Sequence, residues 1–104
     1  MTREELLKEI KSRLTTAHGK RLRCVVLYGS EARGTAGPDS DIDVLVLLEA
    51  PVDLGEDLET NLQVLYPLSL QVERRISALP VEASEYENIE CPLYQTVHRE
   101  GIMI

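Results

Sequence analysis

The chain has 104 residues, of which 43% are hydrophobic; this size and apolar content indicate one hydrophobic core and argue against an intrinsically disordered chain. With 18 acidic against 11 basic side chains its net charge is −7, which repels phosphate backbones and disfavours a long nucleic-acid partner. No stretch approaches the roughly 20 apolar residues of a membrane span and the first residues are charged, so we expect one cytoplasmic domain over residues 1–104, with no signal peptide and no membrane association.

The first half of the chain predicts one helix followed by two strands. Apolar residues recur at helical spacing between a capping Thr2 and a terminating Gly19, at Leu6, Leu7, Ile10, Leu14 and Ala17. The β-branched and apolar run Leu22–Tyr28 predicts a buried strand. After a helical turn over residues 30–34 and a loop, Asp41–Glu49 predicts a second strand that is buried on both faces.

The second half predicts a helix, a strand and two more helices. Leucines at helical spacing, with acidic residues in the early turns, predict a helix that Pro67 stops, namely Leu54, Leu58, Leu62 and Leu65. Leu68–Ile76 alternates apolar and polar side chains and predicts a third strand with one polar face. Ser84–Asn88 and Pro92–Glu100 predict two further helices, and the element order indicates a small α/β or α+β domain.

Two short segments on either side of the first loop carry the chemistry. They are Tyr28-Gly29-Ser30-Glu31-Ala32-Arg33-Gly34 and Asp39-Ser40-Asp41-Ile42-Asp43. A glycine at the end of a strand lets the backbone approach a ligand closely, and the N–H groups that open the next helical turn point toward an anion. A phosphate group is therefore the expected ligand of the turn at Gly29 and Ser30.

Asp41 and Asp43 are two residues apart in a predicted strand, so their carboxylates project from one face while Ile42 and Val44 point to the other. Two neighbouring carboxylates repel each other, and a hard divalent cation relieves this repulsion. Mg²⁺ is commonly held by one or two carboxylates together with substrate phosphate oxygens. The pair therefore predicts a magnesium site opposite the phosphate turn.

Each half of this pattern taken separately has an ordinary structural explanation. Gly29-Ser30 could be only a turn, and Asp39–Asp43 could be only a solvated strand edge or a helix cap. Because both halves occur in this order between two apolar strands, the pattern favours a nucleotide and metal site.

The pattern resembles that of the minimal nucleotidyltransferases (MNT) of the DNA polymerase beta-like superfamily. Their hallmark is intact here as Gly29-Ser30, Ala32-Arg33-Gly34 and Ser40-Asp41-Ile42-Asp43. The resemblance implies a short mixed β-sheet of about three to four strands with helices packed mainly on one face. It also implies ATP as substrate and one or two Mg²⁺ ions on Asp41 and Asp43. The expected nucleotide-binding residues are Gly29, Ser30, Arg33 and Ser40.

The wider superfamily also uses a third acidic residue, on a following strand, to complete metal binding or to help deprotonate the acceptor. Glu73 is the candidate, because it is the only acid inside the predicted third strand and lies on its polar face. The expected catalytic and metal-binding set is Asp41, Asp43 and Glu73. Gln71 could occupy the same place in another register, and Glu73 could be a surface residue paired with an arginine.

Arg33 has two interpretations. Its guanidinium offers a fork of donors that suits a phosphate or an acceptor group. It could equally form a salt bridge with Asp39 or Asp41.

The acceptor is expected to come from a partner, because a chain of this size has no room for an acceptor-binding domain. Standalone domains of this kind resemble the MNT half of two-protein toxin-antitoxin pairs, whose other half is a small helical HEPN ribonuclease. That resemblance implies an antitoxin that transfers AMP from ATP to a tyrosine of its HEPN toxin. The acidic charge of the chain suits a basic partner.

Two alternatives stay open. The chain could be a binding module that has lost the third carboxylate and neutralises its toxin by stoichiometric complex formation. It could also modify a small molecule such as an aminoglycoside, although no segment offers a second substrate pocket. The apolar tail Ile102-Met103-Ile104 predicts association into a homo-oligomer or hetero-oligomer.

Overall fold

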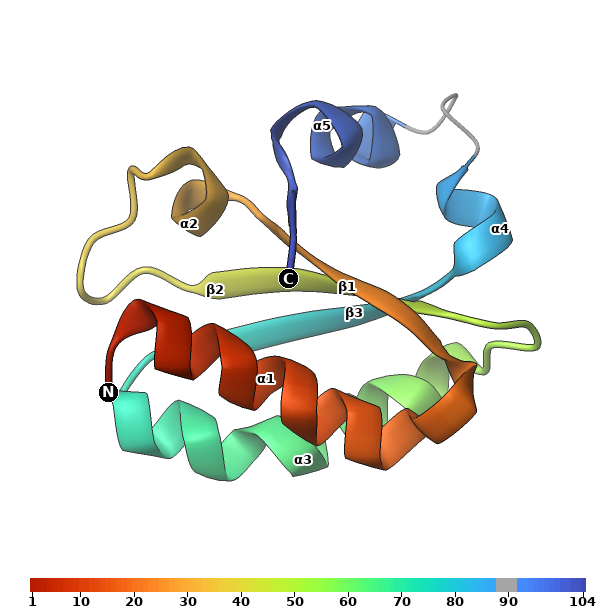
Figure 1. The fold of residues 1–104 in the computed structure, drawn as a ribbon, viewed down its shortest axis with the longest axis horizontal. Coiled ribbons are helices and arrows are strands. Elements are labelled where there is room, and N and C mark those ends of the chain that lie inside the picture. The colour runs from red at the N-terminus through yellow and green to blue at the C-terminus, as the bar shows by residue number, and fades with distance from the viewer. Residues whose placement is uncertain (88–91) are drawn as a thin grey trace.

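The computed structural model describes residues 1–87 and 92–104, and within them the chain forms a four-stranded mixed sheet (Figure 1). The spatial order is β3-β2-β1-β4. The strands are β1 (Leu22–Tyr28), β2 (Ile42–Leu48), β3 (Ile76–Glu82) and β4 (Ile102–Met103). β1 is antiparallel to both of its neighbours, and β2 and β3 are parallel. This arrangement confirms the expected short mixed sheet.

The helices are α1 (Arg3–His18), the 3-10 turn η1 (Gly19–Arg21), α2 (Ser30–Arg33), α3 (Leu54–Val72), α4 (Ala83–Tyr86) and α5 (Pro92–Glu100). The two long helices, α1 and α3, lie side by side on one face of the sheet, whereas α4 and α5 lie over the other (Figure 1). Among the described residues, none of these helices is both long and apolar enough to cross a membrane.

Alternate residues of the strands build two separate hydrophobic clusters, because successive side chains of a strand point to opposite faces. On the α1 and α3 side, the cluster includes Ile10, Leu14, Leu65 and Leu68 of the helices with Val25, Leu27, Val44 and Val46 of the strands. On the α4 and α5 side, it consists of Val26, Leu45, Leu47, Val81, Tyr86 and Val97. β2 is therefore buried on both faces, as its continuous apolar run predicts.

The first helix is confirmed together with its cap. The hydroxyl of Thr2 accepts a hydrogen bond from the backbone N–H of Glu5, and the Glu5 carboxylate accepts one from the backbone N–H of Thr2. This reciprocal capping box satisfies two N–H groups that the first turn leaves without a helical partner.

The prediction that Pro67 ends the second helix and that Leu68–Ile76 is a strand was wrong. α3 continues through Pro67 to Val72, and the third strand begins only at Ile76. Leu65 and Leu68 are buried and Leu70 is 60% exposed, so burial follows helical spacing and not strand alternation. Pro67 is exposed on the outside of the helix, where the loss of one backbone hydrogen bond is tolerated.

β3 contains a proline that sequence reasoning placed after the strand. Pro80 pairs with Val46 of β2 inside the parallel register. β3 is an edge strand of the described sheet, where a proline nitrogen can face outward without breaking a ladder hydrogen bond. The edge position of β3 therefore explains how Pro80 can lie inside a strand.

The C-terminal elements agree in part with expectation. α5 has the predicted bounds. α4, at Ala83–Tyr86, begins one residue before the expected helix Ser84–Asn88 and overlaps its first three residues; the last residue of that expected helix lies outside the described part of the chain. The apolar tail forms the short strand β4 against β1, and the Ile104 N–H donates to the Val25 carbonyl at 3.0 Å.

Candidate active site

The two halves of the sequence motif meet at the end of β1 next to the start of β2. Tyr28 pairs with Asp43 across the two strands. Gly29 has a φ of 74° and a ψ of −155°, a backbone conformation that is essentially restricted to glycine. A Cβ atom built on Gly29 would lie 2.7 Å from Oδ2 of Asp43. The glycine is therefore required both by its backbone conformation and by the carboxylate packed against it.

The short helix α2 opens directly after this glycine. The Arg33 N–H donates to the Gly29 carbonyl at 3.1 Å and the Thr35 N–H donates to the Ser30 carbonyl at 3.0 Å. Gly34 then ends the turn in the left-handed conformation, with a φ of 75°. The N–H groups at the start of α2 have no acceptor within the helix, so they are the groups that the sequence assigns to a phosphate.

The carboxylates of Asp41 and Asp43 lie on the side of the sheet away from α1 and α3. Ile42 between them is fully buried in the α1 and α3 cluster, which leaves the flanking side chains on the opposite face. Asp41 is exposed and Asp43 is half-buried. Burial raises the pKa of Asp43, the charge of Asp41 raises it further, and Arg75 opposes both effects. The two acids therefore interact as the sequence predicts.

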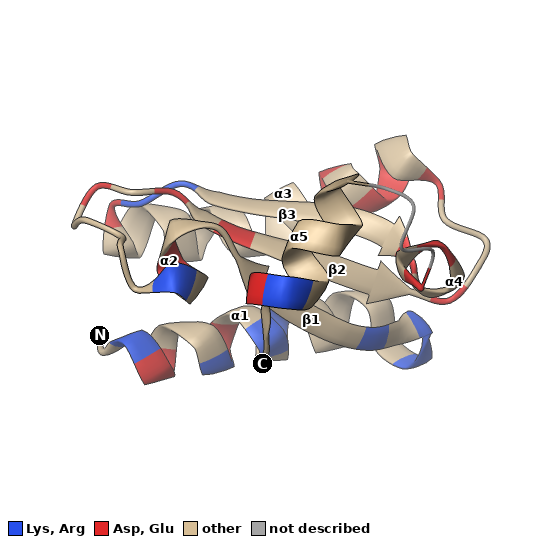
Figure 2. Ribbon diagram, turned by 90° about the horizontal axis from the view of Figure 1, so that it is seen from above, with Lys and Arg blue, Asp and Glu red and all other residues tan. Residues whose placement is uncertain are grey.

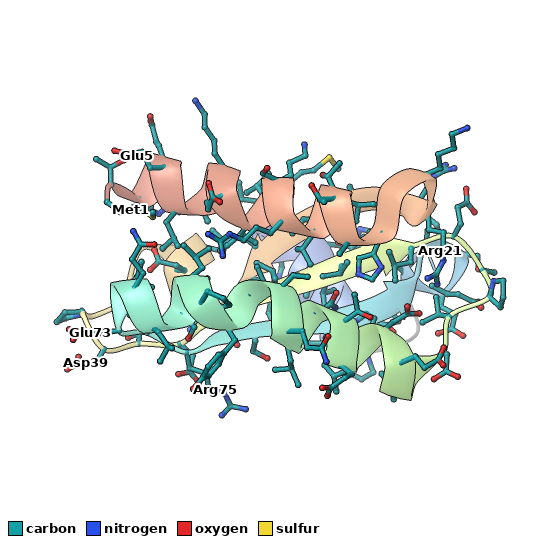
Figure 3. The ribbon with its side chains drawn as sticks, turned by 90° about the horizontal axis from the view of Figure 1, so that it is seen from below. Met1, Glu5, Arg21, Asp39, Glu73 and Arg75 are labelled. Atoms are coloured by element: carbon teal, nitrogen blue, oxygen red, sulfur yellow. The ribbon has the colours of Figure 1, made fainter. Side chains whose placement is uncertain are left out.

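The third predicted carboxylate is not on the third strand. Glu73 is exposed, has a φ of 54° and forms the C-cap of α3, close to Asp39 at one end of the molecule (Figure 3). In the parallel register it is Ser77 that pairs with Asp43. The placement of Glu73 on the polar face of β3 was wrong because the strand begins three residues after it. Its role as a metal ligand stays a prediction.

Arg33 extends from α2 toward α5. Its Nη1 lies 3.5 Å from Oε2 of Glu100, and Figure 2 shows these ends of α2 and α5 next to each other. The alternative pairing of Arg33 with Asp39 or Asp41 is therefore not seen. The Arg33 side chain is 48% exposed, so it can leave this exposed pair to meet a ligand.

Ser40 closes the loop before β2. Its Oγ accepts a hydrogen bond from the Gly37 N–H at 2.8 Å, and its own N–H donates to the Gly37 carbonyl at 3.2 Å. These bonds hold the chain just before Asp41. A contact from Ser40 to a nucleotide stays a prediction.

A profile for the nucleotidyltransferase domain matches residues 3–103, which is nearly the whole chain. The chain belongs to the nucleotidyltransferase domain family. The resemblance inferred from the motif is thus confirmed, and so is the mixed α/β fold that it implies.

Curated relatives of this nucleotidyltransferase domain include two from Methanocaldococcus jannaschii. The putative protein adenylyltransferase MJ0604 is 35% identical over 66 residues, which cover 64% of this chain and 66% of that protein. The putative protein adenylyltransferase MJ0141 is 40% identical over 52 residues, 50% of this chain and 52% of that protein. An aminoglycoside nucleotidyltransferase (4') from Staphylococcus aureus is 41% identical over 51 residues, which are only 20% of its length.

Solved structures share the fold over almost the entire chain. A crystal structure of a toxin-antitoxin with AMP-PNP has a TM-score of 0.66 and 20% identity, over 98% of this chain and 72% of that one. A mutant of the toxin-antitoxin MntA-HpeT has a TM-score of 0.63 and 19% identity, over 100% of this chain and 72% of that one. At these identities the likeness shows a common fold.

The donor set of the nucleotidyltransferase domain fits one Mg²⁺ ion. Asp41 and Asp43 supply two carboxylates, and Mg²⁺ is commonly completed by substrate phosphate oxygens and water. Within residues 1–87 and 92–104 there is no group of three or more histidine, cysteine, aspartate or glutamate side chains placed to hold a metal ion. Asp41 and Asp43 are therefore the described residues that fit an Mg²⁺ ion bound together with a triphosphate.

Sequence reasoning did not assign a role to Arg74 and Arg75, which directly precede β3. The charge of Arg75 opposes the rise in the pKa of Asp43 that burial and Asp41 cause, and the Arg75 carbonyl accepts a hydrogen bond from the Ile42 N–H at 2.9 Å. Arg74 interrupts the apolar pattern of the strand that was expected there. That interruption was the available signal, because a charged residue at an apolar position of an expected strand indicates a specific partner.

Proposed function

We propose that this chain binds magnesium ATP between the turn at Gly29 and Ser30 and the carboxylates of Asp41 and Asp43, and transfers AMP to a hydroxyl group. The observation that carries the proposal is the close approach of Asp43 to Gly29, 2.7 Å from the position of a Cβ atom. It brings a carboxylate against the turn expected to hold phosphate. Such an arrangement suits a ligand that combines phosphate with a divalent cation.

In this reaction the acceptor oxygen attacks the α-phosphorus of ATP. An O–P bond forms, the bond between the α-phosphorus and the bridging oxygen breaks, and pyrophosphate leaves, while the acceptor proton passes to water or a nearby base. The N–H groups at Gly29 and Ser30 would hold the terminal phosphates, and Asp41 and Asp43 would hold Mg²⁺. A bound Mg²⁺ neutralises phosphate charge. Arg33 is free to turn from Glu100 toward a phosphate.

We propose a protein partner as the acceptor, namely a tyrosine of a HEPN ribonuclease toxin, with this chain acting as its antitoxin. Two relatives are described as putative protein adenylyltransferases, and two structures with the same fold are described as toxin-antitoxin complexes. The charge of −7 would attract a basic partner. Residues 1–104 form a single domain in this proposal.

The first test is calorimetric titration of ATP with Mg²⁺ into the wild type and the double variant Asp41→Asn/Asp43→Asn. We expect saturable, metal-dependent binding by the wild type and a loss of at least about tenfold in the variant, because each lost carboxylate removes a metal ligand. The matched control is Glu56→Gln/Glu59→Gln, which removes two exposed acids of α3 and should leave the affinity unchanged. Absence of binding by a folded wild type would contradict the proposal.

A second candidate function is toxin neutralisation by binding alone, and the serine opposite Asp43 favours it. Ser77 occupies the position on β3 beside the carboxylate pair where a third carboxylate would complete a larger metal site. A chain that lacks a third carboxylate could bind its nucleotide and its partner but transfer AMP inefficiently.

The two functions differ in whether the partner becomes labelled. Wild type is incubated with ATP labelled in its α-phosphate, Mg²⁺ and a purified HEPN ribonuclease. Label on the ribonuclease would support transfer, whereas inhibition of the ribonuclease without label would support masking. A parallel Ser77→Asp variant restores a carboxylate beside Asp43, so label that appears only with this variant would identify the missing acid as the cause.

A further inference from the structure

The backbone of Arg74 is held in place by the last turn of α3. Glu73 adopts the left-handed conformation that ends the helix, and the Arg74 N–H then donates to the Ser69 carbonyl at 3.2 Å. The hydroxyl of Ser69 donates in turn to the carbonyl of Arg74. Because both backbone groups of Arg74 are bonded to one residue of a long helix, its side chain starts from a rigid position.

From this position the guanidinium of Arg74 contacts both halves of the nucleotide site. Its Nε donates to the carbonyl of Ser40, the residue before Asp41, at 2.9 Å. Its Nη2 forms an ion pair with Oε1 of Glu31, the residue after Ser30. The side chains of Arg74 and Glu31 are only 16% and 11% exposed, so solvent screens this pair weakly.

Glu31 is held from a second side by Arg3. The Arg3 Nε donates to Oε2 of Glu31 at 3.1 Å, and the Arg3 Nη2 donates to the Glu31 carbonyl at 3.3 Å. Burial acts to raise the pKa of Glu31, but the hydrogen bonds from Arg74 and Arg3 outweigh it and hold the pKa below its ordinary range. Glu31 is therefore an ionised carboxylate that receives guanidinium groups from both α1 and the end of α3.

These contacts join two segments that already meet where Tyr28 of β1 pairs with Asp43 of β2, and that the chain links through an exposed loop. Residues 35–41 between α2 and β2 have no helix or strand, and they include Gly37 and Pro38. A loop of this composition does not fix the distance between its ends. In addition to the pairing of β1 with β2, Arg74 connects the two ends of this loop, because one planar group reaches Glu31 on one side of the loop and Ser40 on the other.

We propose that Arg74 is a positioning residue that, together with the pairing of β1 and β2, sets the separation between the phosphate turn and the carboxylate pair, and thereby the affinity for a metal-bound triphosphate. The part concerning affinity rests on the proposed function. The part concerning position does not, since it follows from the contacts of Arg74 with Ser40 and Glu31. The two parts are tested by separate measurements on the same variants.

The binding measurement uses a non-hydrolysable ATP analogue with Mg²⁺, titrated into the wild type, Arg74→Ala, Arg74→Lys and Glu31→Gln. We expect Arg74→Ala to weaken binding by about tenfold or more, because small misplacements of binding groups are costly. Arg74→Lys should recover part of the lost affinity, because lysine keeps the positive charge. The recovery should be incomplete, because lysine lacks the planar guanidinium that contacts Ser40 and Glu31 together. Glu31→Gln should weaken binding in the same direction and stands in if Arg74→Ala does not fold.

The matched control is Arg21→Ala. Arg21 also binds a buried carboxylate, that of Asp57, and lies at the far end of the molecule from Asp39, Glu73 and Arg75 (Figure 3). A change that acts only through overall stability should lower the melting temperature in both arginine variants and leave the affinity for the analogue unchanged. Equal affinity of wild type and Arg74→Ala would overturn the proposal.

Hydrogen exchange tests the positioning without any ligand. In Arg74→Ala, the amides of Arg33, Thr35 and Ile42 should exchange faster relative to those of α1, whereas Arg21→Ala should leave this ratio unchanged. If the wild type does not bind the analogue, the proposed function fails and the exchange result alone decides the role of Arg74. Unchanged exchange at all three amides would overturn that role.

Discussion

At the scale of single residues, Gly29 shows how one position serves both the fold and the site. Residues other than glycine rarely adopt its backbone conformation. The Asp43 carboxylate also occupies the space that a Cβ atom at this position would need. The same contact brings the phosphate turn against a metal ligand. A substitution here should therefore affect stability and ligand binding together.

We predict that Gly29→Ala lowers the free energy of unfolding by about 1–3 kcal/mol, the cost of a glycine-only conformation, and also weakens binding of magnesium ATP. The control is Gly34→Ala, which meets the same positive φ but has no atom within 4 Å of the new Cβ. It should cost about 1–2 kcal/mol and leave binding nearly unchanged. Urea denaturation and calorimetry measure the two effects, and equal binding losses in both variants would contradict the role of the Asp43 contact.

At the scale of elements, the length of α3 determines where the next strand of the sheet begins. Because α3 runs to Val72, β3 begins at Ile76 and brings Ser77, and not Glu73, beside Asp43. The same helix end also places Arg74 where its guanidinium contacts Ser40 and Glu31. The length of one helix thus decides which side chains of the next strand reach the carboxylates.

We predict that Pro67→Ala stabilises the protein by about 1–3 kcal/mol, because alanine restores a helical N–H and is favoured over proline inside a helix. The lower entropy of the unfolded proline chain offsets part of this gain. Pro38→Ala, in an exposed loop, should change the stability by less than about 0.5 kcal/mol. Thermal denaturation of both variants provides the measurement. An unchanged stability of Pro67→Ala would instead suit a helix that ends before this residue.

At the scale of the whole molecule, Arg21 connects the start of β1 to the start of α3. Its guanidinium donates to both carboxylate oxygens of Asp57 at 3.0 Å and to the carbonyl of Pro51 at 2.8 Å. Asp57 also accepts a hydrogen bond from the N–H of Asp53 at 3.1 Å. The hydrogen bond from Arg21 lowers the pKa of Asp57, although burial opposes the shift.

This lowered pKa predicts how stability depends on pH. The pKa of an unfolded aspartate is about 3.9. The stabilisation by ionised Asp57 is therefore fully present above that pH and is lost as the pH falls through the lower folded pKa. Arg21→Ala should therefore cost about 1–3 kcal/mol near neutral pH, and the difference from wild type should shrink below about pH 4.

Urea denaturation of wild type and Arg21→Ala across this pH range measures the difference. The control is Arg23→Ala, which removes an exposed pair with Glu49, 59% and 50% exposed, and should cost less than about 1 kcal/mol. A difference for Arg21→Ala that grows as the pH falls would contradict the assigned sign.

The features that could be read from the sequence are those that depend on neighbouring residues. The cap at Thr2, the buried strands β1 and β2, and the combination of Gly29-Ser30 with Asp41 and Asp43 all depend on local spacing. Their identification needed only the periods of helices and strands and the geometry of a strand end. The family was accessible for the same reason, because its motif lies in two short segments that are close together along the chain.

The start of β3 and the partners of Glu31, Arg33 and Arg74 depend on packing between distant segments. Leu68, Leu70 and Val72 satisfy strand alternation, while Leu65, Leu68 and Val72 satisfy helical spacing, and only burial of Leu68 beside α1 and the sheet selects the helix. Once that choice is made, Ser77 and Arg74 take their places at the site. A short apolar run fits two periods equally well, and the free energy that separates them comes from contacts with the rest of the molecule.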